Sequence, residues 1–181
     1  GPDQIVNEGD VVYFSGTFSD PGADSHIFEW DFSDGTIAMG THTPEHIYLN
    51  DGTYTVNFTV TDDEGAIGSD TLIVTVDNVA PTVDAGSDDV IDEGDTFTGS
   101  GSFSDPGDDL WTATVDYGEG GGTVLLPLSG KDFSLSNVYE QDGIYTVTVV
   151  VSDDDISSSD TLTVTVKNVA PRVSAPMDAS G

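Results

Sequence analysis

Apolar and polar side chains alternate along much of the chain, in short runs separated by glycine, aspartate and proline. In the run 26–31, Phe28 and Trp30 fall on one side of the chain and Glu29 and Asp31 on the other. A period of two residues is typical of a β-strand with one buried and one solvated face. Trp30 is the largest apolar side chain in this run, so we expect it to anchor a core.

The same alternation predicts β-strands throughout the chain and no helix. We expect strands at 3–7, 11–17, 25–32, 37–48, 53–61 and 69–77, and again at 80–84, 96–102, 110–117, 122–128, 132–139, 144–152 and 159–167. Six or seven short strands in roughly 90–100 residues, with turn signals about every 8–12 residues, are typical of a small β-sandwich.

The sequence also repeats. Gly16–Gly22 returns at 101–107 with an offset of 85, Asp51–Val56 at 142–147 with an offset of 91, and Asn78–Pro81 at 168–171. Matched blocks in one order predict two domains, 1–77 and 78–167, with 168–181 as a linker and the start of a third repeat. The first copy lacks an equivalent of 80–85, so we expect its N-terminal strand to be clipped and the chain to be part of a longer string.

The net charge of the chain argues against several classes of binding partner. Three Lys and Arg residues stand against 34 Asp and Glu residues, for a net charge of −31. Such a chain cannot replace phosphate counterions, which argues against nucleic acid, and an anionic membrane surface would repel it. Repulsion among its own carboxylates must be screened by divalent cations or by salt.

Composition excludes other classes of site. The absence of cysteine excludes a disulfide scaffold, thiolate metal sites and a cysteine nucleophile. No apolar run approaches the roughly 20 residues of a membrane span, and we see no signal peptide.

The carboxylates gather where a sandwich would bring loops together. The loops after the second and sixth strands of an Ig-like sandwich lie at its N-terminal pole. In the second copy these loops hold Asp105–Asp109 and Asp153–Asp155, and the linker Asp77–Pro81 arrives at the same pole. Hard oxygen ligands from three segments suit Ca²⁺, which takes about 6–8 oxygens in irregular geometry. The alternative is that Asp-Gly and Asp-Pro are simply turn residues.

Several motifs together resemble the PKD (polycystic kidney disease) domain of bacterial or archaeal extracellular proteins. They are Glu8-Gly9-Asp10, Phe18–Gly22, Trp30–Thr36, Pro44–Tyr48, Asp51–Val56 and Val60–Gly65. The second copy departs from the pattern at 115–120, where V-D-Y-G-E-G resembles a bacterial variant of the motif. The resemblance implies an all-β fold of two tandem Ig-like β-sandwiches, an extracellular, secreted or surface-anchored location, and no catalysis.

The resemblance also implies calcium ligands. It points to Asn78, Asp105 and Asp153 in the second copy and to Asp20 and Asp62 in the first. The linker 77–81 resembles that of a cadherin, which extends the expectation to calcium at the linker. The full set of expected metal ligands is Asp20, Asp62, Asp77, Asn78, Asp105, Asp109 and Asp153, with Glu8, Asp24, Asp51 and Glu93 as a second tier.

Other candidates carry less weight. No ligand spacing joins His26, His42 and His46, so a transition-metal site is disfavoured. Carboxylate pairs could serve glycoside hydrolysis, but small domains without a deep cleft argue against it. Trp111 shares its side with Ala113 and Val115, so we expect it in the core rather than stacked on a sugar.

The sequence therefore predicts a non-catalytic, calcium-binding extracellular spacer or adhesion module whose interdomain angle calcium stiffens. Neighbouring repeats of the same chain are the expected partners, and the chain itself is expected to be a monomer. Two alternatives stay open. One is a protein- or polysaccharide-binding module accessory to a secreted hydrolase, and the other is a halophile-type acidic surface without specific metal sites.

Overall fold

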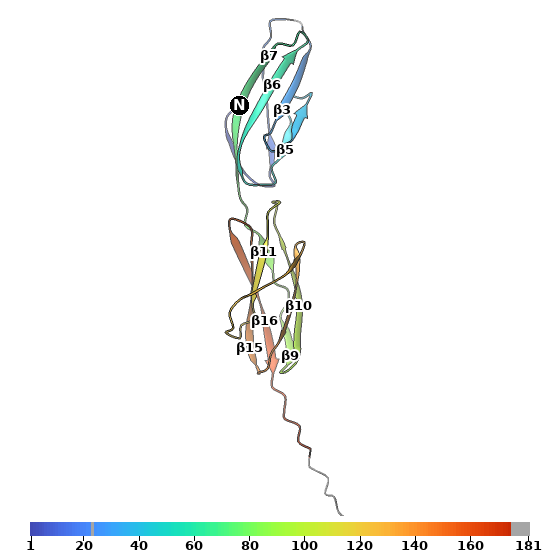
Figure 1. Cartoon of the computed structure of the whole chain (residues 1–181), viewed down its shortest axis with the longest axis vertical. Helices are drawn as coiled ribbons and strands as arrows, with labels where there is room; N and C mark the ends of the chain where they lie inside the picture. Colours follow the sequence, from blue (N-terminus) through green and yellow to red (C-terminus); the bar gives the residue numbers. More distant parts are fainter. Residues whose placement is uncertain (23, 175–181) are drawn as a thin grey trace, which may run out of the picture. The chain divides into compact units, whose positions relative to one another are not determined.

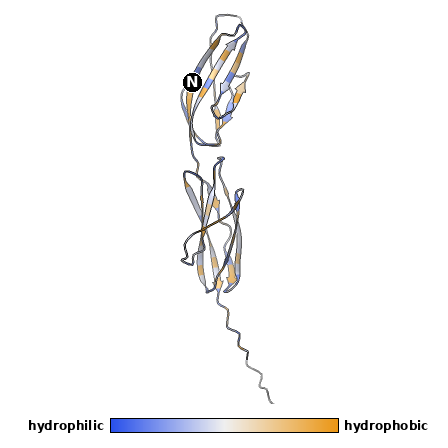
Figure 2. Ribbon diagram, in the orientation of Figure 1, coloured by the Kyte–Doolittle hydropathy of each residue, from blue (hydrophilic) through white to orange (hydrophobic). Residues whose placement is uncertain are grey.

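The computed structural model describes residues 1–22 and 24–174. Every regular element in this part of the chain is a β-strand, as the alternation predicts (Figure 1). Figure 2 shows apolar and polar segments alternating along the strands. The described part of the chain contains no helix long and apolar enough to cross a membrane.

Two compact units divide the chain. The first comprises Gly1–Ala80 together with Asp105–Leu110, and the second comprises Pro81–Ser104 and the residues from Trp111 onward. The loop 105–110 thus packs with the first unit, although it lies between two strands of the second unit in chain order.

The first unit contains a five-stranded sheet and a two-stranded sheet. The larger sheet has the order β1-β7-β6-β3-β4 and the smaller one pairs β2 with β5. Their bounds are β1 Gln4–Asn7, β2 Val11–Tyr13, β3 His26–Asp31, β4 Ile37–Met39, β5 Glu45–Ile47, β6 Gly52–Asp62 and β7 Ile67–Asp77. All neighbours are antiparallel except β1, which runs parallel to β7.

Aromatic rings fill the core of the first unit. Trp30 is buried, as expected, and its ring stacks on Phe58 at 4.4 Å between centroids. Phe14 packs against both Trp30 and Phe32, with centroids 5.4 and 5.3 Å apart. Buried rings at such distances contribute beyond their area alone, so this core depends on a few large side chains.

The second unit contains a four-stranded sheet with the order β13-β14-β10-β8 and a five-stranded sheet with the order β12-β11-β15-β16-β9. Its strands are β8 Thr82–Asp84, β9 Asp89–Asp92, β10 Thr96–Ser104, β11 Thr112–Asp116, β12 Val124–Leu125, β13 Leu128–Ser129, β14 Asp132–Val138, β15 Gly143–Ser152 and β16 Ser157–Lys167. Its core is mostly aliphatic, with Val147, Val149 and Val151 fully buried on β15.

Strand boundaries differ from the sequence-based ones in two instructive places. The run 37–48 forms two strands in different sheets, β4 and β5, because Gly40 has a φ of +77° and Pro44 cannot donate to a ladder. Asp89–Asp92 forms β9, a strand that the sequence did not predict, because acidic residues flank only two apolar ones. It pairs parallel to β16, so tertiary contact rather than local pattern creates it.

Candidate metal centre

The centre is built first from Glu8, in the turn that follows β1. The Glu8 amide donates to the carbonyl of Asp77 at 3.0 Å, and Gly9, with a φ of +77°, donates its amide to the carbonyl of Tyr48 at 2.8 Å. These bonds turn the Glu8 side chain inward, where it is only 1% exposed. Its Oε1 accepts the amide of Val79 at 2.9 Å. A carboxylate this deeply buried needs partners to offset its lost hydration.

The loop 105–110 supplies the other two carboxylates. Asp105 is 9% exposed, and its Oδ1 accepts the amide of Gly107 at 2.8 Å. The amide of Asp108 donates to the carbonyl of Leu49 at 2.8 Å, which fastens the loop. One oxygen each from Glu8, Asp105 and Asp109 then lie within 4.8 Å of one another.

Gly107 leaves room for the carboxylates of Glu8 and Asp109 to approach each other. A Cβ at this position would lie 2.3 Å from Asp109 Oδ2 and 2.8 Å from Glu8 Oε2. Any side chain would therefore displace the carboxylates, so the glycine of the Asp105-Pro106-Gly107 turn is a steric requirement of the cluster.

Electrostatics make the cluster a candidate cation site. At an effective dielectric constant of about 20, two carboxylate charges about 5 Å apart repel by roughly 3 kcal/mol. Such groups relieve the repulsion by binding a proton or a cation. Carboxylate oxygens from two segments are the ligand type that Ca²⁺ prefers, so the residues present fit calcium in chemistry.

A second acidic cluster lies elsewhere in the first unit. Asp24, Asp63 and Glu64 each offer a carboxylate oxygen within 4.8 Å of the others. Asp63 and Glu64 are exposed, so this cluster is well hydrated. Neither residue was among the expected ligands. The adjacent acidic residues in the turn 62–65 were the available signal, but nothing in the sequence placed Asp24 beside them.

Asp20 and Asp62, two other expected ligands of the first unit, accept hydrogen bonds within their own loops. Asp20 accepts the amide of Gly22 at 2.8 Å and contacts His26 Nε2 at 3.1 Å, and these bonds lower the pKa of the Asp20 carboxyl. Asp62 accepts the amide of Ala66 at 2.8 Å. Asp20 and Asp62 line one hollow of about 250 Å³. Asp51 and Asp77 are exposed, and Asn78 is half-buried.

Two expected ligands lie in the second unit, where their carboxylates accept hydrogen bonds from backbone amides. Asp153 is buried, and its Oδ1 accepts the amides of Asp155 at 2.8 Å and Ile156 at 2.5 Å. Glu93 repeats the backbone role of Glu8, because its Oε1 accepts the amide of Val169 at 2.7 Å. Of the expected set, the structure therefore gathers Asp105 and Asp109 with the second-tier Glu8.

The histidines pack and pair rather than cluster. His46 stacks on Phe32 at 4.1 Å and reaches Asp34 Oδ2 at 2.6 Å. Burial raises the pKa of Asp34, but hydrogen bonds from Thr36 and His46 outweigh it and leave the pKa below its usual value. His42 packs edge-on against Phe28. No histidine belongs to either acidic cluster among the described residues.

Trp111 lies at the margin of the second core. Its ring is half-buried, packs on Phe103 at 5.6 Å, and has Lys131 Nζ 4.4 Å from its centroid. The cation over the ring is an attractive arrangement. The indole thus contacts Phe103 and Lys131 of its own unit.

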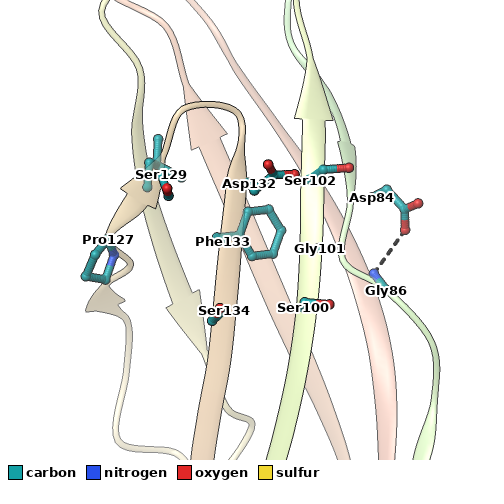
Figure 3. Close-up of a pocket in the computed structure, with 11 residues that line it drawn as sticks. Asp84, Gly86, Ser100, Gly101, Ser102, Pro127, Ser129, Asp132, Phe133 and Ser134 are labelled. Atoms are coloured by element: carbon teal, nitrogen blue, oxygen red, sulfur yellow. Dashed lines mark hydrogen bonds between the residues drawn. The ribbon is translucent and has the colours of Figure 1, made fainter.

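The second unit also carries an open polar groove of about 740 Å³ (Figure 3). Asp84, Ser102 and Asp132 are paired across β8, β10 and β14 along it. Asp84 accepts the amide of Gly86 at 3.0 Å. The ring of Phe133 covers Gly101, where a Cβ would lie 2.5 Å from it.

Comparison with known proteins now identifies the family. The model of the PKD domain matches residues 1–76 and 78–167, so the chain belongs to the PKD family and contains two tandem PKD domains. PKD domains are non-catalytic modules that usually occur in extracellular or surface proteins.

Solved structures of Ig-like and fibronectin-like pairs are similar. Fibronectin(III)-like modules of Clostridium thermocellum CbhA match at 17% identity and a TM-score of 0.40, covering 96% of this chain and 95% of that one. The titin domains Z1Z2 in complex with telethonin match at 13% identity and a TM-score of 0.49, covering 93% and 94%. Drosophila N-cadherin EC1-3 matches at 16% identity and a TM-score of 0.42, covering 92% and 65%.

Proposed function

We propose that this PKD pair is a non-catalytic, calcium-binding spacer or adhesion module of a larger secreted or cell-surface protein. The observation that carries the proposal is the convergence of Glu8, Asp105 and Asp109 within 4.8 Å, two of them almost fully buried. A divalent cation would neutralise their repulsion and hold the loop 105–110 to the turn at Glu8. Calcium would then stabilise the first unit selectively.

The net charge of −31 supports the same proposal. A surface with so few cations gains stability from any counterion, yet only a formed site distinguishes Ca²⁺ from Mg²⁺, which demands a tighter octahedral geometry. Asp153, Asp20 and Asp62 remain proposed ligands of further sites, supported by the position of Asp62 and Asp153 at the ends of β6 and β15 and of Asp20 beside Asp62 in one hollow.

A thermal melt after chelation tests the proposal. At about 0.5 M NaCl, exposed charges are screened within a few ångströms, so a remaining effect of calcium reports a site. A ligand that binds only the folded state at 100 times its Kd stabilises it by about 2.7 kcal/mol. We expect a saturable rise in the melting temperature of the first unit with Ca²⁺ and a much smaller one with Mg²⁺.

Glu8→Gln is the decisive variant, and Glu93→Gln is its matched control. Glutamine retains an oxygen that can accept the amide of Val79 or Val169, so both variants keep the backbone bond and lose one charge. Glu8→Gln should abolish the calcium-dependent rise, whereas Glu93→Gln should preserve it. If calcium raised the melting temperature of both variants equally, or if NaCl alone gave all the stabilisation, the carboxylates would form a screened acidic surface and no specific metal site.

The groove of Figure 3 favours a second candidate, a polysaccharide-binding module. Its serine hydroxyls could donate hydrogen bonds to a sugar and accept them from it, and the carboxylates of Asp84 and Asp132 could accept them from sugar hydroxyls. Native gels cast with soluble polysaccharides would show retardation that Asp132→Ala abolishes. Unchanged mobility in every polysaccharide would count against this candidate.

A further inference from the structure

Each unit has a short strand that runs parallel to its last strand and ends abreast of it. β1 pairs with β7, and its final residue Asn7 lies beside Asp77 at the end of β7. β9 pairs with β16 in the same way, and Asp92 lies beside Lys167. The residue after the short strand is a glutamate in both copies. That glutamate therefore stands where the chain leaves the last strand of its unit.

In the first unit, Glu8 binds the outgoing chain on both sides of Asn78. Its amide donates to the carbonyl of Asp77 at 3.0 Å, and its Oε1 accepts the amide of Val79 at 2.9 Å. The Glu8 residue is 1% exposed, so little water competes for the Val79 amide. The first two residues beyond β7 are thus held against the unit that they leave.

The second unit repeats both bonds. The amide of Glu93 donates to the carbonyl of Lys167 at 2.9 Å, and its Oε1 accepts the amide of Val169 at 2.7 Å. Glu93 is half-buried and belongs to neither acidic cluster among the described residues. The arrangement therefore forms without the carboxylates that surround Glu8. We call this pair of bonds, made by one glutamate to the chain leaving its unit, the exit clamp.

The exit clamp is fastened to the core of its own unit. The amide of Gly9 donates to the carbonyl of Tyr48, and the amide of Gly94 to the carbonyl of Tyr139, both at 2.8 Å. Both glycines have a positive φ, +77° and +83°, which allows the turn that follows the glutamate. Both tyrosines are buried. A rigid path thus leads from a core ring through the turn to the outgoing chain.

We propose that Glu8 and Glu93 are positioning residues that fix the direction in which the chain leaves each unit. Segments between domains are exposed and flexible by default, and relative motion of the domains follows. A hydrogen bond to an ionised carboxylate is roughly twice as strong as a neutral one. The exit clamp needs no cation, so it goes beyond the calcium centre and gives the spacer a stiffness that chelation does not remove.

Amide exchange after chelation tests the exit clamp in the second unit, where no acidic cluster complicates the result. Loss of one hydrogen bond should accelerate exchange of the Val169 amide about tenfold in Glu93→Ala. Glu93→Gln retains an acceptor oxygen and should restore most of the protection. The matched control is Asp88→Ala, because Asp88 Oδ1 accepts the amide of Thr163 within β16. It should accelerate exchange at Thr163 and leave Val169 unchanged.

Two results of this experiment would overturn the proposal. One is an unchanged Val169 amide in Glu93→Ala, and the other is equal acceleration of Val169 by Asp88→Ala, which would indicate general loosening of the unit. Glu93→Asp covers the case in which the alanine variant does not fold. It keeps the charge but shortens the side chain, so it too should release the Val169 amide.

Spin labels measure direction, which a merely stabilising glutamate would not change. The chain has no cysteine, so Ser159→Cys on β16 and Ala170→Cys beyond it can carry the two labels. The distribution of distances between them should broaden in Glu93→Ala and return to its original width in Glu93→Gln, while Asp88→Ala leaves it narrow. Equal widths with Glu93 and with alanine would overturn the proposal.

The first unit separates the exit clamp from the calcium centre. Without divalent cations, the Val79 amide should already be protected, and Glu8→Ala should accelerate its exchange while Glu8→Gln does not. Protection that appears only when Ca²⁺ is added would overturn the cation-free clamp. A melting temperature that ignores Ca²⁺, with Val79 still protected by Glu8, would instead remove the calcium centre and leave the clamp in place.

Discussion

The two copies share several acidic turn residues and differ in what surrounds them. Asp3 accepts the amide of Ile73 at 2.9 Å, and its counterpart Asp88 accepts that of Thr163 at 2.7 Å. In the second unit, β8 pairs with the end of β10 and places Val83 opposite Phe103. Phe103 is 5% exposed, whereas its counterpart Phe18 is 44% exposed, so one sequence motif has different surroundings in the two units.

The glutamates provide a second comparison. Glu8 and Glu93 accept the amides of Val79 and Val169 in the same way. Only Glu8 also meets Asp105 and Asp109. The turn chemistry is therefore common to both copies, and the candidate metal centre arises from what packs against the turn.

Core truncation should produce the largest difference between the units. Trp30→Ala removes a ring stacked on Phe58 and an indole N–H that donates to the carbonyl of Thr41 at 3.2 Å. Such a change costs about 3–5 kcal/mol. Val115→Ala, at the corresponding position of the second unit, removes far fewer atoms. Calorimetry should show the first transition lost or strongly lowered by Trp30→Ala, and only a modest shift with Val115→Ala. Similar losses would contradict the difference in core construction.

Alkaline pH should weaken both units through matched tyrosines. Burial raises the pKa of Tyr139 from 10.0 to about 12, and burial also raises the pKa of Tyr48. The folded state holds the neutral phenol, so this stability is complete below pH 10 and is lost as the pH rises through about 12.

Denaturant melts between pH 9 and 12 measure this loss, because that range spans the unfolded and folded pKa values of Tyr139. Tyr139→Phe should remove the steep part of the decline from the second unit, while the first unit keeps it through Tyr48. An unchanged profile in Tyr139→Phe would exclude this tyrosine as the cause.

Asp62, at the end of β6, and Asp153, directly after β15, should differ by a smaller amount in their contribution to stability. Asp153 accepts two backbone amides, whereas Asp62 accepts one from Ala66. A buried donor left without its partner costs about 1–3 kcal/mol. Asp153→Ala should therefore destabilise the second unit more than Asp62→Ala destabilises the first, with or without calcium, in urea unfolding. The reverse order would show that these carboxylates act mainly on something other than their turns.

The smallest expected effect on stability concerns Asp160 and the amide of Ala85. Asp160 accepts the amide of Ala85 at 2.9 Å, and this bond lowers the pKa of the Asp160 carboxyl. Its counterpart Asp70 is exposed. Asp160→Ala should cost about 1 kcal/mol, and Asp70→Ala should cost less.

Folding lowers the pKa of the Asp160 carboxyl. Its contribution to the free energy of unfolding is therefore present above the unfolded pKa, near 3.8, and is lost as the pH falls through the folded-state pKa. Urea melts from pH 7 to pH 2 measure it. A larger effect at Asp70 than at Asp160 would contradict the stabilising role assigned to the bond between Ala85 and Asp160.

The sequence by itself determined the all-β class, the tandem repeat and the buried position of Trp30. A period of two places every second side chain inward whatever the topology, and a repeat needs no structure to be seen. The sequence also named Asp105 and Asp109, since their turn is acidic and follows a predicted strand.

Only the tertiary structure decided which carboxylates meet. Glu8 lies 97 residues before Asp105 and shares no local pattern with it, so their convergence follows from packing of the loop 105–110. Phe103 is buried and Phe18 is exposed although an identical Phe-Ser-Asp-Pro-Gly motif occurs at both places, so the motif alone does not determine burial. Local pattern fixes which side a residue faces, and the elements that come to lie against that side fix what it does.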